Sequence, residues 1–233
     1  LNFKLLKSKK TKTEFVYLLS KLLKNINVLS PGFAGEGLNI STNLEFKRNW
    51  GLGSSSTLIN NVSNWLNINP YDLLKTTYNG SGYDIAVANS KKSIFFQKKG
   101  DINEITPARF SPPFKDNLFF IHLNKKVNSQ KEVTKFLNQK NEYKDDILKI
   151  NSLGEMLVKE KNQKIFNEMV KEHEEIISKI ISKKPIQKVI FKDFCGQIKS
   201  LGSWGGDFIL ASGDTETPNY FSKKGYNIII PFS

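Results

Sequence analysis

The chain has 233 residues and carries 35 lysines and arginines against 22 aspartates and glutamates, a formal net charge of +13. Its apolar fraction of 39% and charged fraction of 24% are those of a globular protein and exclude a disordered or fibrous chain. The single cysteine, Cys195, cannot form an internal disulfide, and no apolar run approaches the roughly 18 to 20 residues of a membrane span. We therefore expect a cytoplasmic protein that does not enter a membrane.

The positive charge raises the question of a nucleic-acid partner, because clustered lysines neutralise phosphates. The lysines are spread over most of the chain, however, and the arginines are only Arg48 and Arg109. Arginine is the residue favoured for bidentate contacts to bases and phosphates. The pattern favours a solvated lysine-rich surface over a nucleic-acid interface, and such a surface would attract small acidic metabolites.

The first part of the chain predicts a helix, a strand and a second helix. Apolar residues between Phe15 and Leu23 recur at helical spacing, and this helix must end before Pro31. Residues 38–46 alternate apolar and polar side chains, which is the period of a half-buried strand. Helical spacing returns at residues 58–66, so the Gly/Ser-rich segment between these two elements is predicted to join a strand to a helix.

The next helix has a clear start. Asn69 is a favourable N-cap, Pro70 suits the first helical position and Asp72 lies in the first turn. This helix is predicted to end near Gly80, and residues 93–97 are predicted to form a strand.

The proline-rich residues 105–115 are predicted to connect two lobes, a first domain of residues 1–115 and a second of residues 116–233. The second domain is predicted to contain these elements in order: a strand at 118–123, helical stretches over 130–159, a helix at 165–181, a helical stretch at 189–201, a strand at 208–211, a short helix from Thr217 and a strand at 226–230. Strands and helices do not alternate strictly, so we expect an α+β fold with mainly antiparallel sheets.

Three glycine-rich segments lie beside predicted regular elements. The first is Gly51-Leu52-Gly53-Ser54-Ser55-Ser56, which opens a predicted helix. Such a segment presents free backbone N–H groups and the positive end of a helix dipole, and its serines add hydroxyls for phosphate or a magnesium ion. No Gly-Lys-Ser/Thr follows, so the segment is not a Walker P-loop, and an ordinary turn with a serine cap is the alternative.

The second segment is Gly80-Ser81-Gly82-Tyr83-Asp84. Its glycines allow the backbone to approach a ligand closely, and Asp84 could orient a substrate hydroxyl or accept its proton. A turn residue at the start of a strand is the alternative role for Asp84.

The third segment is Gly202-Ser203-Trp204-Gly205-Gly206-Asp207, which precedes a predicted buried strand. Taken alone it could be a tight turn. Three such segments together favour a cleft that binds phosphate.

The three segments, in this order, resemble the motifs of the GHMP kinases, and the resemblance extends from about Gly37 to the C-terminus. The Gly-Tyr-Asp-Ile-Ala run and the Gly-Gly-Asp ending of the third segment look most similar to phosphomevalonate and mevalonate kinases. The resemblance implies an N-terminal lobe like ribosomal protein S5 domain 2, a ferredoxin-like C-terminal lobe, ATP and Mg²⁺ as cofactors, and mevalonate or phosphomevalonate as the acidic substrate.

The resemblance also implies residue roles. Asp84 would be the catalytic carboxylate, and the phosphates of ATP would be bound by Gly51, Gly53, Ser54, Ser55 and Ser56. The loops that contact the substrate or its phosphate would be formed by Gly80, Ser81, Gly82, Gly202, Ser203, Gly205, Gly206 and Asp207.

The sequence departs from the family pattern in three places. Ser203 and Trp204 replace small residues, which would add bulk near the cleft. The glutamate that binds magnesium in mevalonate kinases has no counterpart between Trp50 and Asp84, so Ser55 is the candidate ligand, with Asp72 or water as alternatives. The family's first motif would lie before Leu1; we expect the natural chain to begin earlier, because no initiator methionine is present, and we expect these residues alone to be inactive or impaired.

Several alternatives stay open. Another GHMP kinase, acting on homoserine or a sugar, would carry the same motifs, and a non-catalytic basic module that binds nucleic acid is a further reading. Lys199, Arg48 and Arg109 are candidate contacts for a substrate phosphate or ordinary surface residues. His173 is predicted to pack in the core, since it lies on an apolar helical stripe and, with His122 far away in sequence, no set of metal ligands is evident. The oligomeric state is open, a homodimer included.

Overall fold

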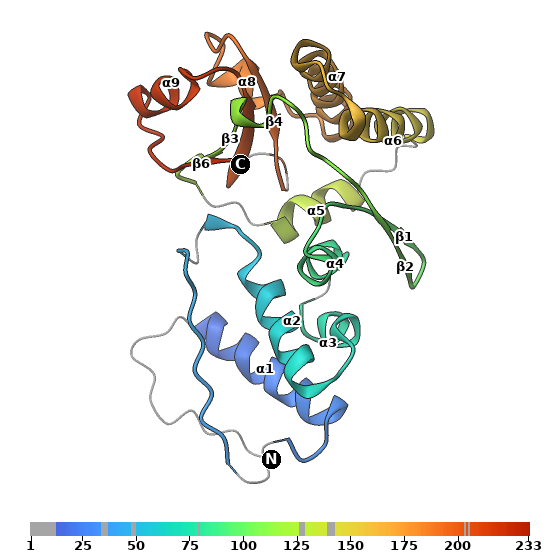
Figure 1. The fold of residues 1–233 in the computed structure, drawn as a ribbon. Helices are drawn as coiled ribbons and strands as arrows, with labels where there is room; N and C mark the ends of the chain where they lie inside the picture. The colour runs from blue at the N-terminus through green and yellow to red at the C-terminus, as the bar shows by residue number, and fades with distance from the viewer. Residues whose placement is uncertain are drawn as a thin grey trace. The chain divides into compact units, whose positions relative to one another are not determined.

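A computed structural model describes residues 13–33, 37–47, 50–78, 80–125, 129–138, 143–202, 204 and 206–233, with the backbone alone for 13–16 and 129–131. The chain divides into two compact units (Figure 1). The first comprises Leu1–Glu45 and Gly53–Ala108, and the second comprises Phe46–Leu52 and Arg109–Ser233. The short segment Phe46–Leu52 thus belongs to the second unit, although the residues on both sides of it belong to the first.

The first unit is mainly helical. Its elements are α1 (Thr13–Leu29), α2 (Ser54–Leu66), α3 (Pro70–Thr77), α4 (Tyr83–Ser90), β1 (Ile94–Lys99) and β2 (Ile102–Pro107). The core forms where the apolar stripes of the helices meet, and its buried members are Leu22, Ile26, Ile59, Leu73, Leu74 and Ile85. The start of α3 is as predicted, because the Asn69 side chain accepts a hydrogen bond from the Tyr71 amide and Pro70 occupies the first turn.

Three details of the first unit differ from the sequence prediction. Residues 37–44 form no strand, and Leu38 and Ile40 are about half exposed, at 49% and 50%. A strand needs a hydrogen-bonded neighbour, and no described residue pairs with this segment. Residues 102–107, part of which was expected to be a connection, pair with β1 as an antiparallel hairpin, and α4 was not predicted.

The second unit is built on a four-stranded antiparallel sheet. Its elements are a 3₁₀ turn (Lys115–Asn117), β3 (Leu118–His122), α5 (Ser129–Leu137), α6 (Lys144–Lys159), α7 (Gln163–Ile181), α8 (Ile186–Val189), β4 (Gln197–Ser200), β5 (Phe208–Ser212), α9 (Thr217–Lys223) and β6 (Ile229–Pro231). The strand order is β4-β5-β3-β6, which is that of the ferredoxin-like β-α-β-β-α-β arrangement. The predicted α+β class is therefore confirmed.

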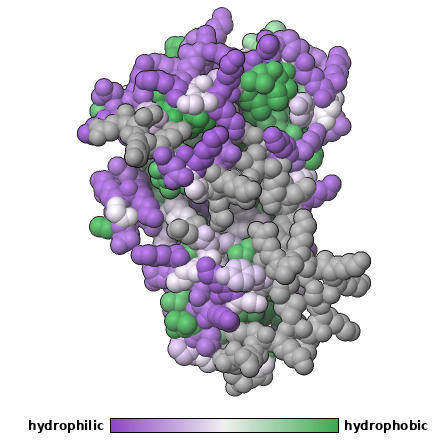
Figure 2. Space-filling model, turned by 180° about the vertical axis from the view of Figure 1, so that it is seen from behind, coloured by the Kyte–Doolittle hydropathy of each residue, from purple (hydrophilic) through white to green (hydrophobic). Residues whose placement is uncertain are grey.

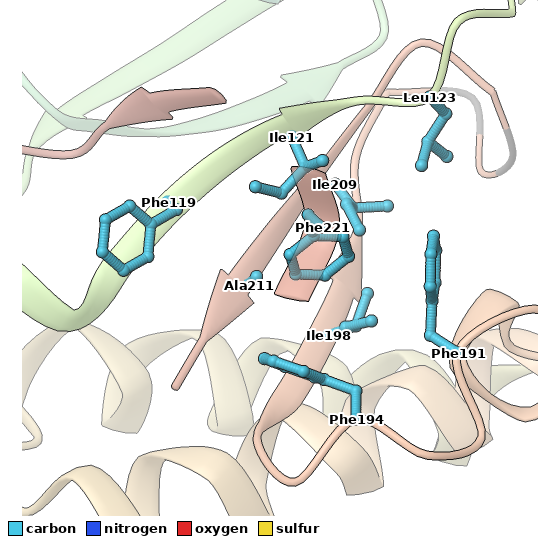
Figure 3. Packing of buried hydrophobic residues seen from close by; sticks show 9 residues of the cluster. All are labelled: Phe119, Ile121, Leu123, Phe191, Phe194, Ile198, Ile209, Ala211 and Phe221. Carbon is cyan, nitrogen blue, oxygen red and sulfur yellow. The ribbon is translucent and has the colours of Figure 1, made fainter. Parts of the chain in front are cut away.

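Alternate residues of the sheet enter two different cores. On one face Phe119, Ile121, Ile198, Ile209 and Ala211 meet Phe191, Phe194 and Phe221 (Figure 3). On the other face Leu118 and Leu210 pack with Phe166 and Val170 of α7 and with Leu157 of α6. This two-sided burial explains the nearly continuous apolar runs of β3 and β5.

The helix predicted at residues 189–201 is wrong. Helix α8 ends at Val189, where the predicted helix was to begin, and residues 197–200 form the edge strand β4. Phe191, Phe194 and Ile198 recur at three- and four-residue spacing, which imitates a helix, but pairing with β5 buries Ile198 in the same core as the two phenylalanines.

The surface agrees with the scattered lysines of the sequence. On the face drawn in Figure 2, hydrophilic side chains predominate and hydrophobic ones gather only in small separate patches. Among the described residues, no helix combines the length and the apolar character needed to cross a membrane.

Candidate functional site

The loop before α2 is shaped by two glycines. Gly51 and Gly53 have φ angles of 74° and 71°, in the left-handed region that side chains rarely adopt. Gly53 is the N-cap of α2 and has no side chain to cap the helix, and the first turn contains no acidic residue. The amides at this helix start are therefore available to an anion, together with the positive end of the helix dipole.

Asp84 lies beside this helix start, within the same unit. It occupies the first turn of α4, two residues after the N-cap Gly82, whose φ angle is 87°. The Ser56 hydroxyl, from the first turn of α2, donates a hydrogen bond of 3.5 Å to Oδ2 of Asp84. The structure thus brings together the serine-rich loop and the carboxylate that the sequence singled out separately.

The environment of Asp84 changes its acidity. Although Asp84 is exposed at the surface, partial desolvation by its neighbours raises the pKa of this carboxyl group, and hydrogen bonds from Tyr83 and Ser56 lower it by a smaller amount. Burial, together with the charge and the hydrogen bond of Asp84, raises the pKa of Tyr83 to about 12. Asp84 is therefore a stronger base than an ordinary aspartate and is held in place by two hydroxyl groups.

The remaining residues of the second segment support the turn. Gly82 is buried, and a side chain there would lie 2.9 Å from the ring of Tyr71. The Ser81 hydroxyl accepts a hydrogen bond of 3.5 Å from the Tyr83 amide, and Gly80 is exposed. The contact with Tyr71 and the left-handed backbone explain the glycine at position 82.

A second group of candidate residues meets within the second unit. Gly51 lies against Asp207, so closely that a Cβ atom on Gly51 would overlap the Asp207 carboxyl group. The neighbouring Trp50 ring packs on His122 and Phe208, with ring centroids 5.9 and 6.4 Å away. The beginning of the first glycine-rich segment therefore contacts the end of the third.

The third segment is described only in part, since Ser203 and Gly205 lie outside the described residues. Gly202 and Trp204 both have left-handed backbones, with φ angles of 60° and 61°, and Gly206 is buried. The Trp204 side chain is only 7% exposed and packs into the second unit.

Trp204 is held by a buried carboxylate that the sequence prediction missed. Glu174 of α7 is 2% exposed and accepts hydrogen bonds from the Ser200 amide (3.0 Å), the Ser200 hydroxyl (2.8 Å) and Nε1 of Trp204 (3.2 Å). Burial raises the pKa of Glu174, while nearby Lys199 and these hydrogen bonds lower it. The signal was present in the sequence, because Glu174 follows Phe166 and Val170 at four-residue intervals on the apolar side of the helix.

The other candidate contacts are divided between surface and interior. Arg109 is exposed, whereas Arg48 lies outside the described residues. Nζ of Lys199 lies 3.5 Å from Nδ1 of His173, and both residues are partly buried, whereas His122 is buried. Tyr83 is a further residue whose role was missed, although it stands next to Asp84 in the quoted segment.

The described residues contain no group of three or more His, Cys, Asp or Glu residues able to hold a metal ion. Ser55, the predicted magnesium ligand, is exposed in the first turn of α2. A hydrogen bond from the Ser56 hydroxyl joins the carboxylate of Asp84 to this turn.

Replacing Tyr83 by phenylalanine should raise the pKa of Asp84 further, because the Tyr83 hydroxyl bonds to the charged form of the carboxylate. The measurement is a ¹³C NMR titration of the Asp84 carboxyl group. Tyr17→Phe, at an exposed tyrosine of α1, is the control and should leave the titration unchanged. A lower or unaltered pKa in Tyr83→Phe would contradict the hydrogen bond.

Alanine at Gly51 should destabilise the protein more than alanine at Gly53. Both substitutions force a side chain into a left-handed backbone, at about 1 kcal/mol. Only Gly51→Ala also meets the Asp207 carboxyl group, whereas a Cβ on Gly53 has open space. Urea unfolding of the two variants gives the comparison, and equal losses would show that the contact with Asp207 costs nothing.

Comparison with known proteins identifies the fold. No family model matches the sequence, and no curated protein matches it either. Among solved structures, a Lin0012 protein from Listeria innocua aligns with a TM-score of 0.62 and 18% identity, over 97% of this chain and 80% of the other. The L. major mevalonate kinase in complex with R-mevalonate has a TM-score of 0.58 and 12% identity, over 94% and 78%.

The Streptococcus pneumoniae phosphomevalonate kinase also has a TM-score of 0.58, at 15% identity, over 92% of this chain and 80% of the kinase. The two kinases and this chain share an α+β architecture over nearly the whole length of the chain. At such low identity the similarity concerns the backbone alone. The chain has the fold of the GHMP kinases.

Proposed function

We propose that this protein is an ATP-dependent kinase of the GHMP type, which transfers the γ-phosphoryl group to mevalonate or phosphomevalonate. The observation that carries the proposal is the hydrogen bond from Ser56 to Asp84, which places a carboxylate of raised pKa at an uncapped helix start. The fold shared with the two kinases supports it. Fold alone does not define a reaction, so the argument rests on these residues.

The residues at the start of α2 fit a triphosphate. Gly51 and Gly53 both have left-handed backbones, the space beside Gly53 is open, and the amides of the first turn can donate to phosphate oxygens. Ser54, Ser55 and Ser56 add hydroxyl donors around the same turn. We assign these five residues to ATP, as the sequence predicts.

Magnesium fits the same place on chemical grounds. Mg²⁺ is usually held by one or two carboxylates together with phosphates and water, so it does not require a cage of protein ligands. In the proposal the Ser55 hydroxyl contributes a ligand. The bound ion would neutralise charge on the phosphates.

Asp84 is the proposed catalytic residue. Its raised pKa makes it a better proton acceptor, and Tyr83 and Ser56 fix its orientation. With mevalonate, the attacking group is a hydroxyl whose proton Asp84 can accept. With phosphomevalonate, the attacking oxygen is already ionised, so Asp84 would position the acceptor and no proton transfer is needed.

The other glycine-rich residues are assigned to the acceptor and its phosphate. These are Gly80, Ser81, Gly82, Gly202, Ser203, Gly205, Gly206 and Asp207. The positive charge of the protein would help to attract an acidic acceptor. In the proposal the protein acts in the cytoplasm, where ATP and such acceptors occur together.

A phosphoryl-transfer assay with γ-labelled ATP, run on the full-length form of the protein, tests the proposal. The acceptors are mevalonate, phosphomevalonate, homoserine and galactose, each with and without Mg²⁺. We expect Mg²⁺-dependent label in the product from one of the first two. Transfer only to homoserine or galactose would keep the kinase but change its substrate, and transfer to none would reject the proposed function.

Asp84→Asn should lower turnover about 10²- to 10⁴-fold if the acceptor is a hydroxyl, and less if it is a phosphate. Folding should not suffer. Because partial desolvation raises the pKa of Asp84, stability falls as pH rises from the unfolded-state pKa to the folded-state pKa, and this loss persists at neutral pH.

The asparagine variant should therefore be at least as resistant to urea at pH 7 as the parent chain. Steady-state kinetics and urea unfolding, run on the same preparations, separate the two effects. Near-normal turnover with mevalonate would exclude a base role for Asp84.

A further inference from the structure

The second unit contains a pocket that the proposed kinase chemistry does not use. It has a volume of about 530 Å³ and lies among α5, α7, β4 and the start of the third glycine-rich segment. Its apolar walls include Val133, Phe136, Ile177 and Ile181. Pockets of roughly 300 to 1,000 Å³ with mainly apolar walls and a few polar groups are typical small-molecule sites.

Lys199 supplies a positive charge to this pocket. It lines the wall from β4, and its Nζ lies 3.5 Å from Nδ1 of His173. Among the described residues, no carboxylate lies within 4.0 Å of Nζ. Burial and the charge of Lys199 lower the pKa of His173 to about 4, so the imidazole is neutral at pH 7 and brings neither a second positive charge nor a negative one to the ammonium group.

Two acidic residues of this region, Glu174 and Glu132, already interact with other groups. Burial lowers the pKa of Lys199, and the charge of Glu174 raises it by a smaller amount. The oxygens of Glu174 already accept three hydrogen bonds from Ser200 and Trp204. Glu132 lies 3.7 Å from Nζ of Lys183. A partly buried ammonium group without a close anion costs free energy, which an anionic ligand would offset.

We propose that this pocket binds a small amphipathic carboxylate, with the carboxylate paired to Lys199 and the hydrocarbon chain against the apolar walls. The two parts of the ligand follow from different observations. The carboxylate follows from the lysine that has no close anion, and the hydrocarbon chain follows from the apolar walls of the pocket. A purely polar anion would leave those walls in contact with water. A neutral lipid would leave the lysine without a partner.

The pocket is connected to the third glycine-rich segment. Gly202 and Trp204 form part of its wall, and Lys183 donates a hydrogen bond of 2.7 Å to the Trp204 carbonyl. A bound carboxylate would therefore contact the segment that the proposed function assigns to the acceptor. The binding itself requires neither ATP nor an acceptor, so its test is independent of the kinase proposal.

Titration calorimetry with octanoate, 1-octanol and octylamine tests the site on the unmodified chain. Octanoate should bind saturably at one site with a Kd below about 1 mM. Octanol has the same chain without the charge and should bind at least ~10-fold more weakly, because a hydrogen bond to a charged partner is lost. Octylamine should bind more weakly still, since it places a second cation near Lys199.

Lys199→Met keeps the aliphatic volume and removes the charge. It should weaken octanoate about tenfold and leave octanol unchanged. Lys188→Met is the matched control, because this exposed lysine pairs with Glu175 away from the pocket, and it should alter neither ligand. Ile177→Trp fills the pocket and should weaken both ligands.

Three results would overturn the proposal: no saturable heat with octanoate, equal affinity for octanoate and octanol, or an unchanged octanoate affinity in Lys199→Met. Circular dichroism establishes that each variant is folded. If Lys199→Met does not fold, the comparison of octanoate with octanol on the unmodified chain decides the outcome alone.

Discussion

The second unit depends on the buried carboxylate of Glu174. A charged group in an apolar interior is tolerated only when its hydrogen bonds are made, and Glu174 receives three of them, from Ser200 and Trp204. These bonds join helix α7 to the edge strand β4 and to the loop that follows it. Because the loop backbone is left-handed at Gly202 and Trp204, it needs such an anchor to keep its shape. The charge of Glu174 also favours the ammonium form of Lys199, so the same carboxylate acts on both the loop and the neighbouring pocket.

The first unit uses a different device, a helix start without a cap. Natural helices usually satisfy their first amides with a serine, threonine or aspartate side chain, and α2 begins instead with glycine. The unsatisfied amides cost stability unless an anion occupies them, which is the usual compromise of a phosphate site. Asp84 adds a second cost, since its partial desolvation disfavours the charged form. The uncapped start of α2 and the carboxylate of raised pKa beside it do not favour folding, and both are consistent with the binding of a ligand.

The first glycine-rich segment, residues 51–56, is divided between the two units. Trp50 packs on His122 and Phe208, and Gly51 lies against Asp207, so these residues belong to the second unit. Gly53 and the serines that follow it belong to the first unit. One continuous glycine-rich segment thus begins in the second unit and continues in the first. Its glycines serve two needs, left-handed backbone at both positions and a close approach to Asp207 at Gly51 only.

The sequence alone determined the α+β class and most of the helices, and it predicted the residues of the candidate site, because helical periodicity, caps and glycine-rich turns are local properties. Tertiary structure decided what depends on partners distant in the chain. The alternating residues 38–46 formed no strand because no described neighbour pairs with them, while residues 197–200 became a strand because β5 does. The contact of Ser56 with Asp84, the raised pKa that partial desolvation gives this carboxylate, and the burial of Glu174 under Trp204 likewise required the folded chain. Such contacts join residues about 30 positions apart, and no local pattern encodes which of them will meet.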